Sequence, residues 1–262
     1  MIKIISGHSH YGGSTTAHIN MCNEFNSNSI PCEFYGPHEW HTTKCNGKSI
    51  KDLTINKNDI IICHYISIPT RPFCEKLIYS VHEYSNICDI KRFNINIFDG
   101  IHFVSERVKN QQISHENNKF KIIPNFVDNL KPSIKQHKVA GIIGTIDNNK
   151  QTHISIIRAI DAGFTDIRLF GSVSDNVYYT NNILPLLQKY NFIKIIGYIE
   201  DKQAMYDSIS DVYHSSLSET WGYIKAECLL TNVEYHGNNQ TDNTEYLENS
   251  IILNKWKEFI GL

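Results

Sequence analysis

The sequence of 262 residues is long enough for one large domain or two small ones, each with its own core. Its contents of 41% hydrophobic and 20% charged residues are those of a globular protein. It contains no run of about 18 apolar residues, so we expect no membrane-spanning helix. The formal net charge of -2 creates no overall field that would attract a polyanion.

The amino terminus and the cysteines favour a cytoplasmic protein. The apolar start at residues 1–5 turns polar too early for a secretory signal. The seven cysteines are odd in number and lack CxxC spacing, which favours reduced, buried thiols. Four candidate zinc ligands lie close together: Cys32, His38, His41 and Cys45. Their irregular spacing is not that of paired zinc ligands, so we expect no metal site there.

Short apolar runs that alternate with helical stretches predict parallel α/β units in the first half. The strand candidates are residues 2–5, 32–35, 59–64, 77–81, 100–104 and 120–123. Residues 14–25 predict a helix, with Ser14 or Thr15 available as its N-cap. The turn before it contains Gly12 and Gly13, where a helix amino terminus favours negative charge. Such a Gly-Gly turn is equally often structural.

A polar segment with no apolar period, residues 128–137, predicts the connection between two domains. We place the first domain at 1–130, the linker at 131–137, the second domain at 138–246 and a carboxyl-terminal helix at 247–262. The last segment has apolar residues at helical spacing, and we expect it to pack back across the domains.

The alternation of strands and helices resumes after the linker. Strands are expected at 139–144, 167–171, 193–197 and 212–215, and helices at 151–162, 181–190, 202–210 and 222–230. The sequence therefore predicts two doubly wound parallel sheets in tandem. We expect their strand ends to face a central cleft, where ligands of such folds bind.

Two glutamates eight residues apart, Glu219 and Glu227, carry the clearest candidate chemistry. We expect Glu219 in the loop before the last helix of the second domain and Glu227 inside that helix. Ionised carboxylates accept hydrogen bonds from sugar hydroxyls, so the pair can hold a sugar ligand from two sides. The structural alternative is that Glu219 caps the helix and Glu227 forms a surface ion pair.

Taken together, these segments resemble glycosyltransferase family four and its GT-B relatives. The matching segments follow the family's order: Gly12-Gly13, 80–83, 122–128, 144–150, 170–171, 196–198 and 215–227. The last one fits the family's motif of two glutamates separated by seven residues, with Trp221 in place of phenylalanine. The resemblance implies two Rossmann-like domains and a retaining, metal-independent hexosyl- or pentosyltransferase. A nucleotide sugar, first of all a UDP-sugar, would be its co-substrate, without any other cofactor.

The resemblance also implies roles for particular residues. Glu219 would contact hydroxyls of the donor sugar, Glu227 the ribose, and Lys150 would neutralise the diphosphate. Gly12 and Gly13 would lie beneath the phosphates or the sugar, and His82 beside the reacting carbon. The remaining donor-binding positions are Thr145, Gly171, Tyr198, Thr220, Trp221 and Gly222.

The chain departs from the family at the expected diphosphate site. Thr145 stands where the family has an arginine, and Arg168 or Lys194 are candidates to replace that positive charge. The chain is also shorter than the usual members. Because both glutamates and Lys150 are present, we expect an active enzyme.

The motifs do not specify the acceptor, and three interpretations remain. A cell-surface glycan or lipid-linked sugar is the family's usual acceptor. Short transferases of this type also resemble those of T-even-like bacteriophages, which act on 5-hydroxymethylcytosine in DNA; this would require base flipping and basic contacts to phosphates. The basic candidates, which are equally compatible with plain solvated surface, are Lys91, Arg92, Arg107, Lys109, Lys119 and Lys121. The third interpretation is a non-catalytic protein that binds nucleotide sugars.

Overall fold

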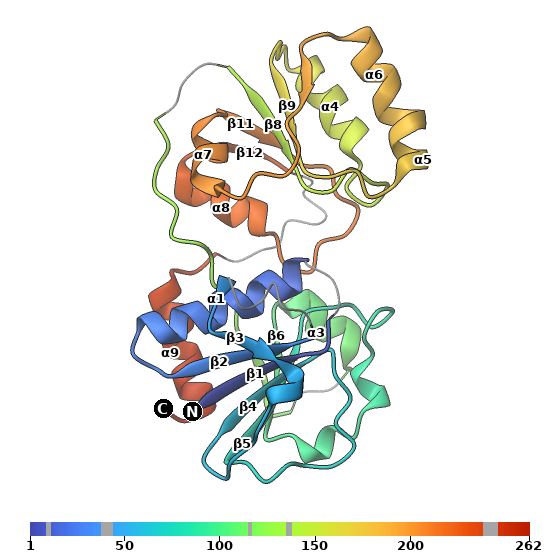
Figure 1. Cartoon of the computed structure of the whole chain (residues 1–262). Coiled ribbons are helices and arrows are strands. Elements are labelled where there is room, and N and C mark those ends of the chain that lie inside the picture. Colours follow the sequence, from blue (N-terminus) through green and yellow to red (C-terminus); the bar gives the residue numbers. More distant parts are fainter. Residues whose placement is uncertain (9–11, 38–43, 115–116, 135–137, 238–245) are drawn as a thin grey trace. The chain divides into compact units, whose positions relative to one another are not determined.

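The computed structural model describes residues 1–8, 12–37, 44–114, 117–134, 138–237 and 246–262. The chain divides into two compact units (Figure 1): Met1–Val127 with Glu245–Leu262, and Asp128–Thr244. Each unit has its own parallel sheet and its own core, as expected from the alternating pattern. Among the described helices, none is long and apolar enough to cross a membrane.

The first unit is built on a parallel sheet with the order β3-β2-β1-β4-β5-β6-β7. Its strands are β1 (Ile2–Ser6), β2 (Cys32–Gly36), β3 (Gly47–Ser49), β4 (Ile60–His64), β5 (Lys76–Val81), β6 (Gly100–Phe103) and β7 (Phe120–Ile122). The chain runs outward from β1 to β3 and then returns to β4 on the other side of β1. All six expected strands are present. The edge strand β3 was not expected, because its three residues contain no apolar side chain.

The helices with described bounds in the first unit are α1 (Gly13–Ser27), α3 (Glu106–Gln112) and α9 (Asn249–Ile260), with short 3-10 turns η1 (Ile50–Asp52), η2 (Ile90–Arg92) and η3 (Ile95–Ile97). The expected N-cap at Ser14 or Thr15 is wrong, because α1 already begins at Gly13. Gly12 is its N-cap, and no described side chain caps the helix.

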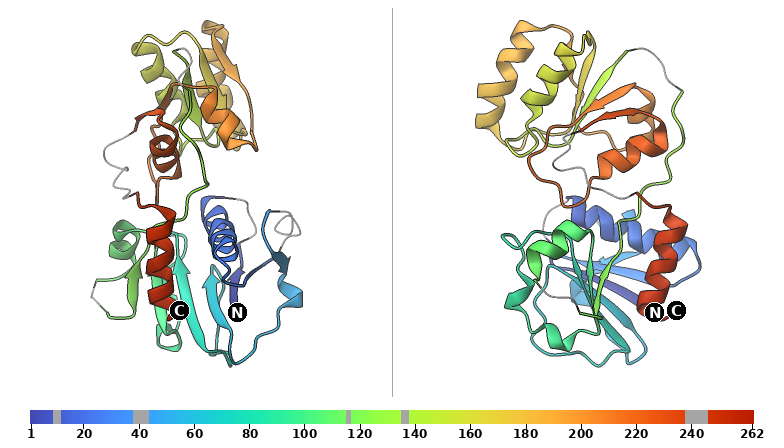
Figure 2. Two further views of the ribbon diagram at one scale, coloured as in Figure 1. Left: turned by 90° about the vertical axis from the view of Figure 1, so that its left-hand side faces the viewer. Right: turned by 180° about the vertical axis from the view of Figure 1, so that it is seen from behind.

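The carboxyl-terminal helix α9 packs on the first unit (Figure 2). The side-chain amide of Asn249 accepts from the Val127 backbone nitrogen at 3.0 Å and donates to the Val127 carbonyl at 2.8 Å. Trp256 is fully buried in the core of this unit and meets Phe25 of α1 edge-on. The apolar face of α9 is therefore a part of the first unit's core.

The second unit has a parallel sheet with the order β10-β9-β8-β11-β12. The strands are β8 (Ala140–Ile143), β9 (Ile167–Phe170), β10 (Ile193–Ile195), β11 (Asp211–Tyr213) and β12 (Glu234–His236). The strand order reverses at β8, because β9 and β10 lie on one side of it and β11 and β12 on the other. The loops after β8 and β11 therefore lie beside each other at the carboxyl edge of the sheet. In open α/β sheets this is where ligands bind. The short edge strand β12 was not expected.

Helices cover both faces of this second sheet. They are α4 (Thr152–Asp161), α5 (Asn176–Tyr178), the π-helical η4 (Tyr179–Ile183), α6 (Leu184–Lys189), α7 (Lys202–Asp207) and α8 (Tyr223–Thr231). One core contains Ile142, Ile156 and Leu169, and the other contains Phe170 and Val212. Burial on both faces explains why the central strand β8 is a continuous apolar run in the sequence.

The expected linker belongs in part to the second unit. The Lys131 backbone nitrogen donates to Gln203 Oε1 at 2.8 Å, and the Ser133 backbone nitrogen donates to the Thr231 carbonyl at 2.8 Å. Its residues 135–137 lie outside the described part of the chain. The same holds for His38 and His41 of the Cys/His group considered above. None of the seven cysteines forms a disulfide.

Candidate functional site

Lys150 ends the loop that follows β8 and leads into α4. The carboxylate of Asp147 shapes this loop: Oδ1 accepts from the Lys150 backbone nitrogen at 2.8 Å. Oδ2 accepts from the Thr145 hydroxyl at 2.6 Å and from the Ser174 hydroxyl at 3.1 Å. Thr145 therefore braces the loop and adds no positive charge to it.

Hydrogen bonds join this loop to the one that precedes α8. The Asn149 carbonyl accepts from the Leu217 backbone nitrogen at 2.8 Å and from the Ser216 hydroxyl at 3.4 Å. Arg158 of α4 donates to the His214 carbonyl at 3.3 Å and to Ser215 Oγ at 3.0 Å. The loops after the adjacent strands β8 and β11 are thus held in one arrangement.

This arrangement brings Glu219 to Lys150. The Lys150 ammonium lies 2.5 Å from Glu219 Oε1, and His214 Nε2 donates to the same oxygen at 3.0 Å. Burial opposes ionisation of Glu219, but the His214 hydrogen bond and the Lys150 charge outweigh it and lower its pKa to about 2. Glu219 is consequently a carboxylate at any physiological pH and acts only as an acceptor.

Glu227 forms a second centre on the same helix, α8. Its Oε1 lies 2.6 Å from the Lys202 ammonium, and its Oε2 accepts from the Tyr206 hydroxyl at 2.8 Å. Lys202 also lies 2.5 Å from Asp128 Oδ2. Burial disfavours the charge of Lys202, but the carboxylates of Glu227 and Asp128 raise its pKa above the ordinary value. Glu227 is only 3% exposed, so a ribose that binds it must share its oxygens with Lys202 or Tyr206.

The structural alternative is wrong about the capping role of Glu219 and about the surface location of Glu227, although Glu227 does form an ion pair. No described side chain caps α8, whose N-cap is Gly222, and Glu219 is held by Lys150 and His214 instead. Glu227 is not on the surface but in the interior. Glu219 pairs with Lys150 and Glu227 pairs with Lys202.

The start of α8 connects the two centres. Trp221 is 5% exposed and meets Tyr223 edge-on with ring centroids 4.8 Å apart. The Lys202 ammonium lies 5.8 Å from the centroid of the Tyr223 ring. The buried Trp221 Nε1 finds no hydrogen-bond partner among the described residues. Thr220, between Glu219 and Trp221, is partly exposed.

Two further expected donor-binding residues follow β9 and β10. Gly171 has a φ of 149°, and a Cβ there would collide with the Gly144 carbonyl oxygen. Only glycine therefore allows the loops after β8 and β9 to approach this closely. Tyr198 lies beyond β10 and is 64% exposed.

Arg168 and Lys194, the expected substitutes for the missing arginine, both pair with Asp166. Arg168 lies 3.0 Å and Lys194 3.7 Å from its carboxylate. The second lysine beside the glutamates is instead Lys202, which the sequence analysis missed together with His214. Lys202 stands at the first position of a short helix and matches no motif. His214 immediately precedes the 215–227 segment, and this adjacency was the available signal.

In the first unit, His82 directly follows β5 and is 3% exposed. Its Nε2 lies 3.1 Å from Ser80 Oγ, which is also 3.0 Å from His18 Nε2 and 2.8 Å from His102 Nδ1. Burial and the neighbouring histidines lower the pKa of His82, so its ring is neutral at pH 7. A hydrogen bond from His82 Nε2 to a substrate would therefore have to replace its contact with Ser80.

Gly12 and Gly13 are both exposed at the start of α1. A Cβ on either residue would meet no atom within 4 Å, and Gly12 has an extended φ of -150°. Neither crowding nor backbone strain requires glycine at these two positions. Open space next to them is compatible with a ligand that approaches the backbone.

The basic residues expected at a DNA contact lie on different elements of the first unit. Lys91 and Arg92 are exposed on η2, and Arg107 lies over the Tyr84 ring at 5.4 Å from its centroid. Lys109 is 8% exposed and pairs with Glu106 at 3.4 Å. Lys119 and Lys121 instead line a cavity of about 410 Å³ with Lys76, Lys255, Asp99 and Glu258.

No protein-family model and no curated protein sequence matches the chain. Solved structures of glycosyltransferases do match it in fold. HepE from Anabaena in complex with UDP and glucose has a TM-score of 0.65 at 12% identity, over 98% of this chain and 90% of that one. A glycosyltransferase from Rickettsia africae has a TM-score of 0.68 at 13% identity, over 93% of this chain and 80% of that one. WaaG, a glycosyltransferase involved in lipopolysaccharide biosynthesis, has a TM-score of 0.61 at 8% identity, over 100% of this chain and 91% of that one.

These likenesses, together with the two parallel sheets, confirm the expected fold class. The chain has the GT-B fold, with two Rossmann-like α/β domains.

Proposed function

We propose that this chain is a glycosyltransferase that moves a sugar from a nucleotide sugar to a hydroxyl acceptor. The observation that carries the proposal is the contact of Lys150 with Glu219 at the point where the second sheet reverses its strand order. The GT-B fold and the UDP and glucose bound in the HepE structure support a nucleotide-sugar donor, with UDP as the first nucleotide to test.

Lys150 is the proposed partner of the diphosphate leaving group. Cleavage of the sugar–phosphate bond places negative charge on the diphosphate, and a fixed cation at that point lowers the barrier. The amino terminus of α8 adds a partial positive charge at the same edge of the sheet. This arrangement needs no metal ion at the diphosphate.

Glu219 is the proposed acceptor of hydrogen bonds from the donor sugar. Because its pKa is about 2, it stays ionised while Lys150 and His214 hold it in place. Glu227, with Lys202 and Tyr206, is the proposed binding site of the ribose. Gly171, Tyr198, Thr220, Trp221 and Gly222 complete the proposed donor site.

The proposed reaction retains the configuration of the sugar. The bond from the anomeric carbon to the phosphate oxygen breaks, and its electron pair stays on the diphosphate. The acceptor oxygen forms its bond to the same face of that carbon, and its proton passes to a phosphate oxygen. This scheme requires no nucleophile from the protein.

The proposed acceptor is a glycan or a lipid-linked sugar. Lys109 pairs with Glu106, and Lys119 and Lys121 share their cavity with the carboxylates of Asp99 and Glu258. Carboxylates beside these cations do not favour the phosphates of duplex DNA.

Nucleotide binding tests the proposal. UDP, GDP, ADP and CDP are added to the protein, and the shift of the melting temperature is measured, since a ligand that binds only the native state must raise it. We expect a shift with UDP that is lost in Lys150→Ala. Lys194→Ala is the matched control, because Lys194 is an exposed lysine of the same unit paired with Asp166. The proposal fails if no nucleotide shifts the parent protein at millimolar concentration.

A further inference from the structure

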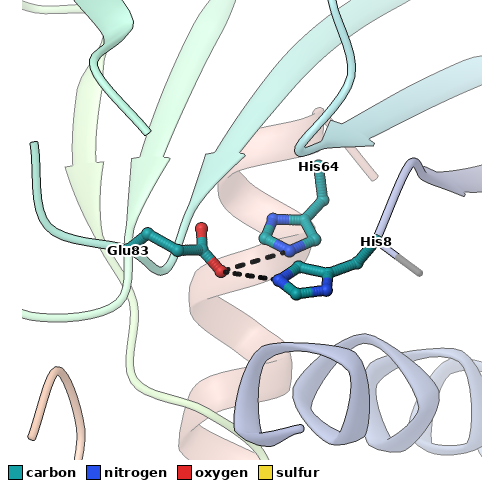
Figure 3. A group of neighbouring side chains, drawn as sticks. All are labelled: His8, His64 and Glu83. Carbon is teal, nitrogen blue, oxygen red and sulfur yellow. Dashed lines mark ion pairs between the residues drawn. The ribbon is translucent and has the colours of Figure 1, made fainter. Parts of the chain in front are cut away.

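Three side chains of the first unit meet at the carboxyl edge of its sheet (Figure 3). His8 follows β1, His64 is the last residue of β4, and Glu83 follows β5 by two positions. These three strands are neighbours in the sheet, and β1 is where the strand order reverses. The group is thus at the position in the first sheet where an open α/β fold binds ligands.

The distances within this group are those of ligands around an ion. Glu83 Oε1 lies 3.5 Å from His64 Nε2 and 4.0 Å from His8 Nε2, and all three atoms lie within 4.8 Å of one another. Hydrogen bonds between such groups are shorter, at about 2.7–3.2 Å. A tetrahedral ion with bonds of about 2.1 Å would hold its ligands about 3.4 Å apart. To bind such an ion, the three ligand atoms would have to move slightly closer together, mainly by a shift of the His8 side chain.

His64 presents an unsatisfied lone pair to this space. The residue is fully buried, and its Nδ1 lies 3.2 Å from the Ser80 carbonyl oxygen, to which it must donate. Nε2 is then an acceptor, and it makes no hydrogen bond in the described part of the chain. Glu83 Oε2 is also buried and makes none there. Two acceptors facing each other in the interior call for a cation between them.

We propose that His8 Nε2, His64 Nε2 and Glu83 bind a divalent transition-metal ion, Zn²⁺ in the first place. Two imidazoles and one carboxylate are a ligand set that zinc accepts, and they leave a fourth position for water or a ligand. The hydrogen bond from His64 Nδ1 to a backbone carbonyl is the usual second contact of a metal-binding histidine.

The backbone around the site supports the placement of His8. The Gly7 nitrogen donates to the His64 carbonyl at 3.0 Å. A Cβ on Gly7 would collide with the Tyr65 carbonyl oxygen, so only glycine lets this loop pass close enough. The His8 ring then stacks on the His64 ring at 9° between the planes, with centroids 5.8 Å apart.

A second group of possible ligands lies in the other unit and lacks these properties. His236 Nε2 lies 2.8 Å from Asp211 Oδ1, a direct hydrogen bond that uses the nitrogen. The side chain of Glu234 is 64% exposed. Because this group is already satisfied, it provides a matched control. The proposed metal site does not rest on the proposed function.

The test is metal binding by the whole protein after treatment with a chelator. Zn²⁺ is titrated against a chromophoric competitor, and Co²⁺ is used as a spectroscopic probe. We expect a single Zn²⁺ site and Co²⁺ bands in the visible without thiolate-to-cobalt charge transfer. That absence separates this site from binding by any of the seven cysteines. His8→Ala and Glu83→Gln should each weaken Zn²⁺ binding by at least about tenfold, while His236→Gln should not.

The melting temperatures of the metal-free variants show whether each is folded. The proposal is overturned if the parent binds no Zn²⁺ or if folded His8→Ala and Glu83→Gln bind it as the parent does. It is also overturned if Glu83→Gln stabilises the metal-free protein while Zn²⁺ has no effect on the parent, since a proton on Glu83 then fills the gap. Retained UDP binding in the same variants keeps this result independent of the donor site.

Discussion

The Lys150 ammonium lies 2.5 Å from Glu219 Oε1, although the two residues are 69 positions apart in the chain. Hydrogen bonds from Leu217 and Ser216 to the Asn149 carbonyl hold their loops together. The cation proposed for the diphosphate and the carboxylate proposed for the sugar are therefore placed before any donor binds. Such preorganisation is what electrostatic catalysis requires.

The ion pair of Lys202 with Glu227 should matter for stability. Lys202→Met leaves Glu227 buried without its cation, and we expect a loss of about 2 kcal/mol in the free energy of unfolding, reduced by the partial exposure of Lys202. Adding Glu227→Gln should restore part of this loss, because the uncompensated charge is removed. Urea unfolding of the parent, both single variants and the double variant measures the coupling. If the losses of unfolding free energy in the two single variants simply add up in the double variant, the two side chains do not stabilise each other and the assigned ion pair is contradicted.

The pH dependence of stability should report on Glu219. Its pKa falls from 4.5 to about 2 on folding, so the native state favours the carboxylate. The resulting stabilisation, about 3 kcal/mol at most, is complete above pH 4.5 and is lost as the pH falls towards 2. The difference in unfolding free energy between the parent and Glu219→Gln should shrink over that window. A difference that is constant from pH 6 to pH 3 would contradict the assigned ion pair.

Chelation should leave the donor site intact. Because Lys150 and the α8 amino terminus are the proposed partners of the diphosphate, EDTA should change the dissociation constant of UDP by no more than about twofold. Isothermal titration with and without EDTA measures this. A strict requirement for Mg²⁺ or Mn²⁺ in UDP binding would refute the proposed role of Lys150, whatever the metal content of the first unit.

Salt should distinguish the acceptors. Transfer to a sugar acceptor, held by neutral hydroxyls, should change little between about 50 and 200 mM salt, whereas binding to duplex DNA would weaken by tenfold or more. The assay compares a glycan with a duplex that contains 5-hydroxymethylcytosine. Sugar transfer to the duplex would identify DNA as the acceptor if it is lost both at high salt and in the double variant Lys91→Glu, Arg92→Glu. That result would overturn the proposal of a glycan acceptor.

The sequence predicts the parts of the fold that depend on local pattern. Buried strands such as β4 and β8 are apolar runs flanked by turns, and their presence was foreseen. The edge strands β3 and β12 have three residues each and owe their pairing to a neighbouring strand, so no local signal predicts them.

The candidate site was predictable where a motif carried it and not where distant residues meet. Glu219, Glu227 and Lys150 stand in segments that resemble a family. Lys202 meets Asp128 and Glu227 across 74 and 25 positions, and only the folded sheet brings them together. The same is true of His8, His64 and Glu83, which lie at or just beyond the ends of three different strands.

The release of UDP from UDP-sugars tests the central claim most directly. We expect the parent protein to release UDP from at least one UDP-sugar, with the sugar transferred to an acceptor or to water. Glu219→Ala should lower turnover by about 100-fold, or about 3 kcal/mol of transition-state stabilisation. Glu234→Ala, which removes an exposed carboxylate of the same unit, should not. Equal turnover of parent and Glu219→Ala, or no release from any UDP-sugar by a protein that binds UDP, would contradict the account.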